Sequence, residues 1–180
     1  MSQLKVNSII PTGGLSSGAS GGIIQVKQTV KTDTFSEVVA NGNSSSVCIS
    51  LDFAASSSSN KLLIIASLYC DTSDQPTNNG IQLTDDGSII TGARGDASGS
   101  QGRVSGAWGQ VDTNEFVFHA YCEFLHTVSN TSSHTYGVKM YQGSSHSNQT
   151  LFLNMGSTSS TTTRLRPMST LTVMEVSVWV

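Results

Sequence analysis

The chain has 180 residues, a length that fits one domain with a short appendage, and its hydrophobic content of 37% is enough to build a core. Charged residues make up only 12%, about half the usual share, so the polar surface has to come from Ser, Thr, Asn and Gly. The formal net charge of −3 and the nine scattered basic residues argue against nucleic acid as a partner, because phosphate binding needs a concentrated Lys/Arg surface.

The cysteines and the N-terminus indicate where the chain is made. Cys48, Cys70 and Cys122 are an odd number without CxxC spacing, which indicates free, mostly buried thiols rather than a zinc site or a disulfide framework. The N-terminal residues lack the apolar segment of a signal peptide, and no apolar run reaches the ~18 residues of a membrane-spanning helix. We therefore expect a soluble protein that is made in a cytoplasm and does not insert into a membrane.

Residues 1–21 combine a short apolar piece with a flexible linker. The stretch PTGGLSSGASGG, which begins at residue 11, is too rich in Gly and Ser to order by itself. Two interpretations remain open: a frayed terminus, or an arm that adds its apolar strand to another protein. The candidate anchor residues of such an arm are Leu4, Val6, Ile9, Ile10 and Pro11. Residues 22–180 are assigned to a β-sandwich knob.

Two alternating stretches, 22–31 and 46–53, precede the apolar centre of the chain. Each places apolar residues on one face and polar residues on the other, which predicts a half-buried strand. The apolar face of the first stretch comprises Ile24, Val26 and Val30; that of the second comprises Val47, Ile49, Leu51 and Phe53, with Cys48 on the opposite face.

The run NKLLIIASLYC at 60–70 is the apolar centre around which we expect the fold to be organised. One face of this predicted strand carries Leu62, Ile64, Ala66 and Leu68. The other face carries Leu63 and Ile65, and a strand that is apolar on both faces has to be covered on both. We expect one face to lie on the chain's own core and the other to meet a neighbouring subunit.

The rest of the chain also has the pattern of short strands separated by turns. Strands are expected at 80–84, 88–91, around 104–108, and at 115–125, 134–141, 151–153 and 168–180. Asp86-Gly87 predicts a tight hairpin. No segment of useful length shows the 3.6-residue period of an amphipathic helix. The prediction is an all-β fold, a jelly-roll-like antiparallel β-sandwich with an N-terminal extended arm.

Residues that could carry chemistry do not form a recognisable motif. With this much serine, a Ser/His/Asp set arises by chance, and no GxSxG elbow is present. The four histidines, His119, His126, His134 and His146, lack the HxxxH or HxH spacing of a zinc site. Four aspartates, Asp71, Asp74, Asp85 and Asp86, could bind calcium, but turns explain them equally well. We therefore expect no enzyme activity, no cofactor and no metal site.

Three stretches form a recognisable combination: LKVNSIIPTGG at 4–14, SSSSNKLLIIASL at 56–68 and STLTVMEVSV at 169–178. Together they resemble short virion structural or tail-fibre-like proteins of tailed bacteriophages, especially marine and cyanobacterial phages. The resemblance implies a non-enzymatic virion protein in which an arm precedes a jelly-roll knob that trimerises. The chain here ends in an additional apolar Trp179-Val180, and its linker is short and without repeats, which favours a compact knob over a long fibre.

The first functional hypothesis is a homotrimeric knob on the virion surface, bound by its arm to another virion protein of the capsid or tail. It predicts capsid decoration, as a cement protein, or a short fibre. The reason is that the strands carry more apolar surface than one core needs. The candidate residues for the subunit interface are Leu63, Ile65, Leu171, Val173 and Trp179.

The alternative hypothesis is a lectin-like tail-fibre tip that binds a host-surface glycan or receptor. The loops 71–80, 92–102 and 143–149 would then form the binding surface. A third class, a glycan depolymerase or esterase, would need paired carboxylates or an activated nucleophile, for which the sequence has no signature.

Overall fold

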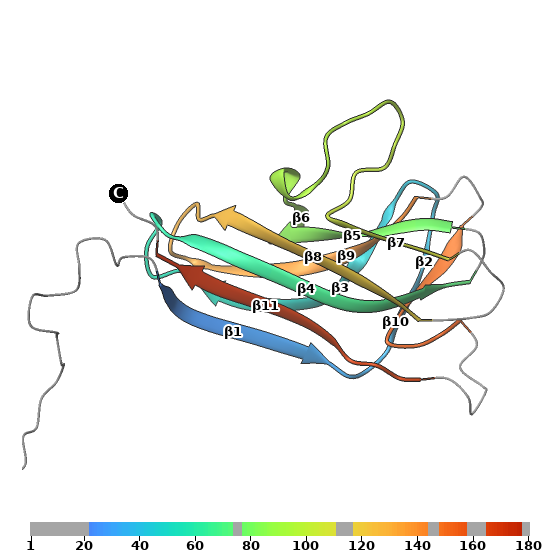
Figure 1. Cartoon of the computed structure of the whole chain (residues 1–180), viewed down its shortest axis with the longest axis horizontal. Helices are drawn as coiled ribbons and strands as arrows, with labels where there is room; N and C mark the ends of the chain where they lie inside the picture. The colour runs from blue at the N-terminus through green and yellow to red at the C-terminus, as the bar shows by residue number, and fades with distance from the viewer. Residues whose placement is uncertain (1–21, 74–76, 111–116, 144–147, 158–164, 178–180) are drawn as a thin grey trace, which may run out of the picture.

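The computed structural model describes residues 22–73, 77–110, 117–143, 148–157 and 165–177. These residues form two antiparallel β-sheets that pack face to face (Figure 1). Their connections cross repeatedly between the two sheets, and the predicted all-β, jelly-roll-like antiparallel sandwich is confirmed. The described residues contain no helix that is long and apolar enough to cross a membrane.

The six-stranded sheet is built around β4, the strand that the sequence places at the centre. Its members are β1 (Ile23–Lys31), β2 (Phe35–Val39), β4 (Lys61–Thr72), β8 (Phe118–Thr127), β10 (Gln149–Leu153) and β11 (Ser169–Val176). β4 pairs with β11 and β8, and the end of β4 pairs with β10. β1 lies beyond β11, and β2 lies beyond β10.

The five-stranded sheet has the order β3-β9-β5-β6, with β7 also paired to β5. Its strands are β3 (Ser44–Ala54), β5 (Thr77–Asp85), β6 (Ser88–Ile89), β7 (Gly106–Gln110) and β9 (Ser133–Gln142), and a short 3₁₀ turn, η1 (Thr91–Ala93), follows β6. Asp86 and Gly87 form the two-residue turn between β5 and β6 with φ values of +48° and +75°. Positive φ at both positions is the geometry that an Asp-Gly hairpin favours, so this predicted hairpin is confirmed.

The core lies between the two sheets and is formed by the inward faces of both. The predicted inward face of β4 is confirmed, since its residues Leu62, Ile64, Ala66 and Leu68 are 0–1% exposed. Residues of β5 and β9 complete the cluster from the other sheet, namely Ile81, Leu83, Val138 and Met140. Burying such side chains is the main favourable contribution to folding.

β3 departs from the expected alternation at its centre. The pairing of β3 with β9 shifts register between Val47 and Ile49, as in a β-bulge. Cys48 is therefore buried together with Ile49, at 4% and 5% exposure, whereas Val47 is only half-buried. Beyond the bulge the predicted inward residues Leu51 and Phe53 are buried as expected.

β1 turns its apolar face outward, whereas the apolar face of a half-buried strand is expected to lie on the core. Its apolar side chains face outward, with Val26 54% exposed. Its polar side chains face the five-stranded sheet, where Gln25 donates a hydrogen bond to the carbonyl of Ala54 and Lys27 Nζ donates one to the carbonyl of Asp52. The polar face of β1 is thus satisfied by the edge of β3, and its apolar face remains uncovered by the described residues.

The carboxylate of Glu175 on β11 fixes the neighbouring segments. It is fully buried and accepts hydrogen bonds from Asn60 Nδ2 at 2.6 Å, Gln25 Nε2 at 2.6 Å, and the backbone N–H and hydroxyl of Ser56. Burial by itself would raise the pKa of this carboxyl, but the hydrogen bonds outweigh burial and lower the pKa to about 2. Glu175 therefore stays ionised and holds β1 and the loop before β4 against β11.

Candidate functional site

An apolar row crosses four strands on the outer face of the six-stranded sheet. In register, Val26 of β1 lies opposite Met174 of β11, Met174 lies opposite Leu63 of β4, and Leu63 lies opposite Leu125 of β8. Val26 and Leu125, at the two ends of the row, are 54% and 51% exposed. With strands ~4.8 Å apart, the row spans about 14 Å.

The adjacent rows extend this apolar surface. Val176 continues it on one side, beside Ile23, which is 61% exposed. Ile65 continues it on the other side. We call these residues the outer apolar face: Ile23, Val26, Leu63, Ile65, Leu125, Met174 and Val176. Contiguous apolar residues at the surface of a sheet are typical of a contact with another protein.

Polar residues border the outer apolar face. Lys61 and Thr127 lie at one end, where Lys61 Nζ donates a hydrogen bond to Thr127 Oγ1. Glu123 of β8 lies opposite Ile65 of β4. Tyr121 donates a hydrogen bond to Glu123. An apolar centre with a polar border is the usual composition of a protein–protein interface.

The structure places only some of the predicted interface residues on this face. Leu63 and Ile65 belong to it. Leu171 and Val173 do not, because both are 0% exposed and lie opposite Ala66 and Ile64 in the core. The outward residues of β11 are instead Thr170, Thr172, Met174 and Val176. The last strand is apolar enough on both faces that its pattern does not indicate which face is inward.

Some of the predicted site residues lie outside the described residues. These are Trp179 of the interface set and all five anchor candidates, Leu4, Val6, Ile9, Ile10 and Pro11. Their roles stay predictions.

Two polar side chains near the outer apolar face are of chemical interest. Ser67 Oγ lies 2.7 Å from His119 Nε2, and the His119 ring lies 5.0 Å from that of Tyr69. A serine beside a histidine is part of a nucleophilic site, which also needs an acid that orients the histidine. Among the residues that the structure describes, no carboxylate forms a hydrogen bond to His119. The pair lies on an exposed strand surface.

The three loops predicted for ligand binding contribute to one pocket of about 390 Å³. Its lining is Asn78, Asn79, Ser100, Gln101, Gly102, Val104, Ala107, Tyr141 and Gly143. Gly102 packs against the ring of Tyr141 so closely that a Cβ atom there would lie 2.4 Å from the ring, so the loop needs glycine at this position. Amide groups beside an aromatic ring offer both hydrogen bonds and an apolar contact to a small polar ligand.

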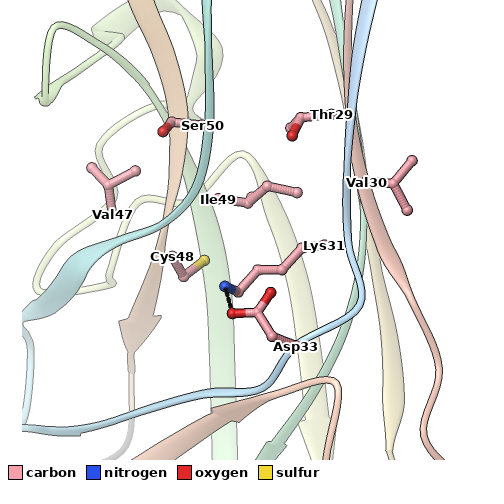
Figure 2. Close-up of a pocket in the computed structure, with 8 residues that line it drawn as sticks. All are labelled: Thr29, Val30, Lys31, Asp33, Val47, Cys48, Ile49 and Ser50. Carbon is pink, nitrogen blue, oxygen red and sulfur yellow. Dashed lines mark hydrogen bonds and ion pairs between the residues drawn. The ribbon is translucent and has the colours of Figure 1, made fainter.

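A second pocket, of about 270 Å³, opens between the edges of β1 and β3 (Figure 2). Lys31 Nζ forms an ion pair with Asp33 at 2.7 Å, and the thiol of Cys48 points toward this pair. Burial raises the pKa of the Cys48 thiol to about 12, so the thiol stays protonated and is a poor nucleophile. Val30 lies on the opposite side of β1, toward the outer sheet face.

The cysteines agree with the expectation of free, buried thiols. Cys48, Cys70 and Cys122 form no disulfide and are buried. Burial likewise raises the pKa of Cys122 to about 12.

The structure also brings together residues that the sequence presents as unrelated. His126 and His134 both lie beside Asp85, and Asp86 lies next to His134. No spacing motif could have identified this cluster, because His126 and His134 belong to strands of different sheets and approach each other only when the sandwich closes.

No protein-family model matches the chain, and no curated protein matches it. Among solved structures, the chain is similar to one described as "Structure of infectious bursal disease virus Gx strain", with a TM-score of 0.43 and 13% sequence identity. The match covers 96% of this chain and 45% of that chain, so the present chain spans less than half the length of that protein. Similarity at this level assigns no family, and the function has to be inferred from the surfaces described above.

Proposed function

We propose that this protein is a non-enzymatic structural component of a bacteriophage virion that assembles through its outer apolar face into a homotrimer. The observation that carries the proposal is the row Val26–Met174–Leu63–Leu125, which leaves apolar side chains in water on a sheet whose other face is already packed. Removing such area from water contributes roughly 25 cal/mol per Å². The resemblance of three stretches to phage virion proteins supports the same role.

The three-fold arrangement is what the resemblance to phage virion proteins implies. Three copies around one axis can each turn the outer apolar face toward that axis, so that equivalent residues from all copies meet and their apolar area is removed from water. The polar border of Lys61, Glu123 and Thr127 would then lie at the rim of the contact, where water satisfies it. The arm at residues 1–21 would attach the trimer to a capsid or tail protein, as decoration or as a short fibre.

Light scattering on the purified full-length protein tests the assembly. We expect a mass three times the 18.9 kDa of one chain. The substitution Leu125→Lys places a charge in the apolar row and should give monomers that remain folded, because Leu125 does not belong to the core. Val38→Lys is the matched control, since Val38 is 64% exposed on β2, outside the outer apolar face. A monomeric wild-type protein, or an unchanged mass for Leu125→Lys, would contradict the proposal.

A second candidate function is supported by the pocket that the three loops form. In this case the protein would be a fibre tip whose Asn78, Gln101 and Tyr141 bind a host-surface glycan. A glycan array probed with the full-length protein should then show binding, and the double substitution Asn78→Ala/Gln101→Ala should abolish it. Asn41→Ala, in the exposed turn after β2, serves as control. An array without bound glycans, or one that the double substitution leaves unchanged, would remove this candidate.

A further inference from the structure

Two histidines and two aspartates converge where the two sheets meet beside the β5–β6 turn. His134 of β9 places Nδ1 at 2.8 Å from Asp85 Oδ1 and at 3.0 Å from Asp86 Oδ2. His126 of β8 places Nε2 at 3.5 Å from Asp85 Oδ2. The ligand atoms of Asp85, Asp86 and His134 all lie within 4.8 Å of one another. The cluster thus joins one strand of the six-stranded sheet to two elements of the five-stranded sheet.

The hydrogen bonds around His134 determine which of its ring nitrogens carries a proton. Asn130 Oδ1 accepts a hydrogen bond from the backbone N–H of Ser132 at 2.7 Å, which identifies that atom as the oxygen. The same oxygen lies 3.1 Å from His134 Nε2, so Nε2 carries a proton and donates it. In a neutral imidazole, Nδ1 then has a lone pair that points at two carboxylates. The nitrogen lone pair and the two carboxylates repel one another unless a cation lies between them, either a proton or a metal ion.

Three further features suit a metal ion. Metal-binding histidines usually donate their second ring N–H to an oxygen, as His134 does to Asn130. A second imidazole, His126, lies at the same carboxylate, with Nε2 at 3.5 Å from Asp85 Oδ2. The side chains of His134, His126 and Asp85 are 15%, 16% and 22% exposed, whereas that of Asp86 is 58% exposed and leaves the cluster accessible from solvent.

The carboxylate of Asp86 is held in place by the backbone around it. Asp86 adopts a φ of +48°, its Oδ1 accepts a hydrogen bond from the N–H of Thr135, and its own N–H donates to the Thr135 carbonyl. Its second oxygen, Oδ2, is the one directed at His134. The ligand atoms therefore stand close together before any ion binds, which reduces the cost of ordering them.

We propose that Asp85, Asp86 and His134 bind a divalent transition-metal ion of the Zn²⁺ type, with His126 next to this site through its contact with Asp85. A mixture of imidazole nitrogen and carboxylate oxygen is a common ligand set for Zn²⁺, whereas Ca²⁺ and Mg²⁺ take oxygen ligands. The ion would fasten the β5–β6 turn to β9, and His126 of β8 would contact the site from the other sheet through Asp85. This inference does not depend on the virion role.

The test uses the full-length protein after treatment with a chelator and dialysis at pH 7.5. Calorimetric titration with Zn²⁺ should show one bound ion, and Co²⁺ in its place should give the visible absorption of an ion bound by protein ligands. The melting temperature should rise with Zn²⁺ concentration, since an ion that binds only the folded state stabilises it.

Two ligand variants and one control make the test specific. His134→Gln and Asp86→Asn should remove saturable Zn²⁺ binding. The Asp86→Asn protein should still fold, because asparagine tolerates a positive φ and its side-chain oxygen can accept the hydrogen bond from the Thr135 N–H. Asn130→Ala, which removes the hydrogen-bond acceptor of His134 Nε2 and of the Ser132 N–H but none of the ligands, should weaken binding about tenfold. His119→Asn, on the outer sheet face, should bind as the wild type does.

Two results would overturn the proposal. The first is a wild-type titration indistinguishable from those of His134→Gln and Asp86→Asn. The second is an NMR spectrum in which both ring nitrogens of His134 remain protonated at pH 7.5 in excess Zn²⁺, because the cation between His134 and the two carboxylates would then be a proton.

Discussion

Glu175 shows how one buried carboxylate can position three segments of the chain. Its oxygens accept hydrogen bonds from Ser56 and Asn60, which precede β4, and from Gln25 of β1. The segment before β4 and the strand β11 therefore meet at this carboxylate. The short polar residues of that segment, which have no evident role in the sequence, are the hydrogen-bond donors that make a buried charge tolerable.

At the residue scale we predict that Glu175→Gln lowers the free energy of unfolding by about 2 kcal/mol, because a neutral amide accepts fewer hydrogen bonds and points its own N–H groups at other donors. Urea denaturation measures this change. Glu123→Gln is the matched control, since Glu123 is exposed on β8 and should alter stability by only about 0.5 kcal/mol or less. Equal effects of the two substitutions would contradict this role of Glu175.

The same carboxylate predicts a pH dependence. The pKa of Glu175 is about 2 in the folded protein, against an ordinary value of 4.5. Because the unfolded chain takes up a proton first as the pH falls, the stabilisation by Glu175 is fully present above the ordinary value and is lost between pH 4.5 and 2. Urea midpoints in this range should fall more steeply for the wild type than for Glu175→Gln. Parallel curves would show that other groups cause the acid sensitivity.

At the scale of elements, alternation predicts that a strand has two different faces but not which face is covered. β4 and β8 follow the expectation, since their most apolar faces point inward. β1 does not, because it is an edge strand whose polar side chains reach the rim of β3, as Lys27 does at the carbonyl of Asp52. Where a strand lies in the sheet is decided by pairing between distant segments, which a single sequence does not display.

The same limit applies to the candidate sites. The hairpin at Asp86-Gly87 could be predicted because its turn geometry is encoded locally by two residues. The bulge at Cys48 could not, because it depends on the register between β3 and β9. The cluster around His134 depends on the pairing of β5 with β9 and on the approach of His126 from the other sheet, so its members appear unrelated in the sequence.

Two neighbouring isoleucines of β4 give a prediction for the two faces of this strand. Ile64 is 1% exposed in the core, so Ile64→Ala should cost about 3 kcal/mol of folding free energy. Ile65 lies on the outer apolar face, so Ile65→Ala should cost clearly less on folding but should weaken association of the subunits. Denaturation at low protein concentration and light scattering at several concentrations separate the two effects. An Ile65→Ala protein that assembles like the wild type would argue against this face as the contact.

At the scale of the whole molecule, low charge and an uncovered sheet face occur together. Only 12% of the residues are charged, so few like charges would oppose the approach of identical copies. The outer apolar face is formed by β1, β11, β4 and β8, which are joined by backbone pairing. The Glu175 hydrogen bonds add links between β11, β1 and the segment before β4. A stiff surface of this kind is suited to repeated, identical contacts.

If residues 1–21 attach the protein to the particle and the sandwich alone forms the trimer, a truncation should separate the two properties. Deleting residues 2–20 should leave a protein that folds and assembles, because the first strand among the described residues begins at Ile23. The truncated protein should no longer join the particle. Circular dichroism and light scattering check folding and assembly, and incorporation into purified particles checks attachment. Equal incorporation of truncated and full-length protein would assign attachment to the knob.

Gly22, where the described chain begins, is fastened to the end of β11 by two hydrogen bonds, from its N–H to Ser177 Oγ and from the Ser177 N–H to its carbonyl. Ile23, the next residue, already belongs to the outer apolar face. If three copies meet through that face, their N-terminal tethers emerge next to one another, and each tether that docks raises the local concentration of the other two. Three weak contacts would then together give the trimer a higher affinity for the particle than a single copy has.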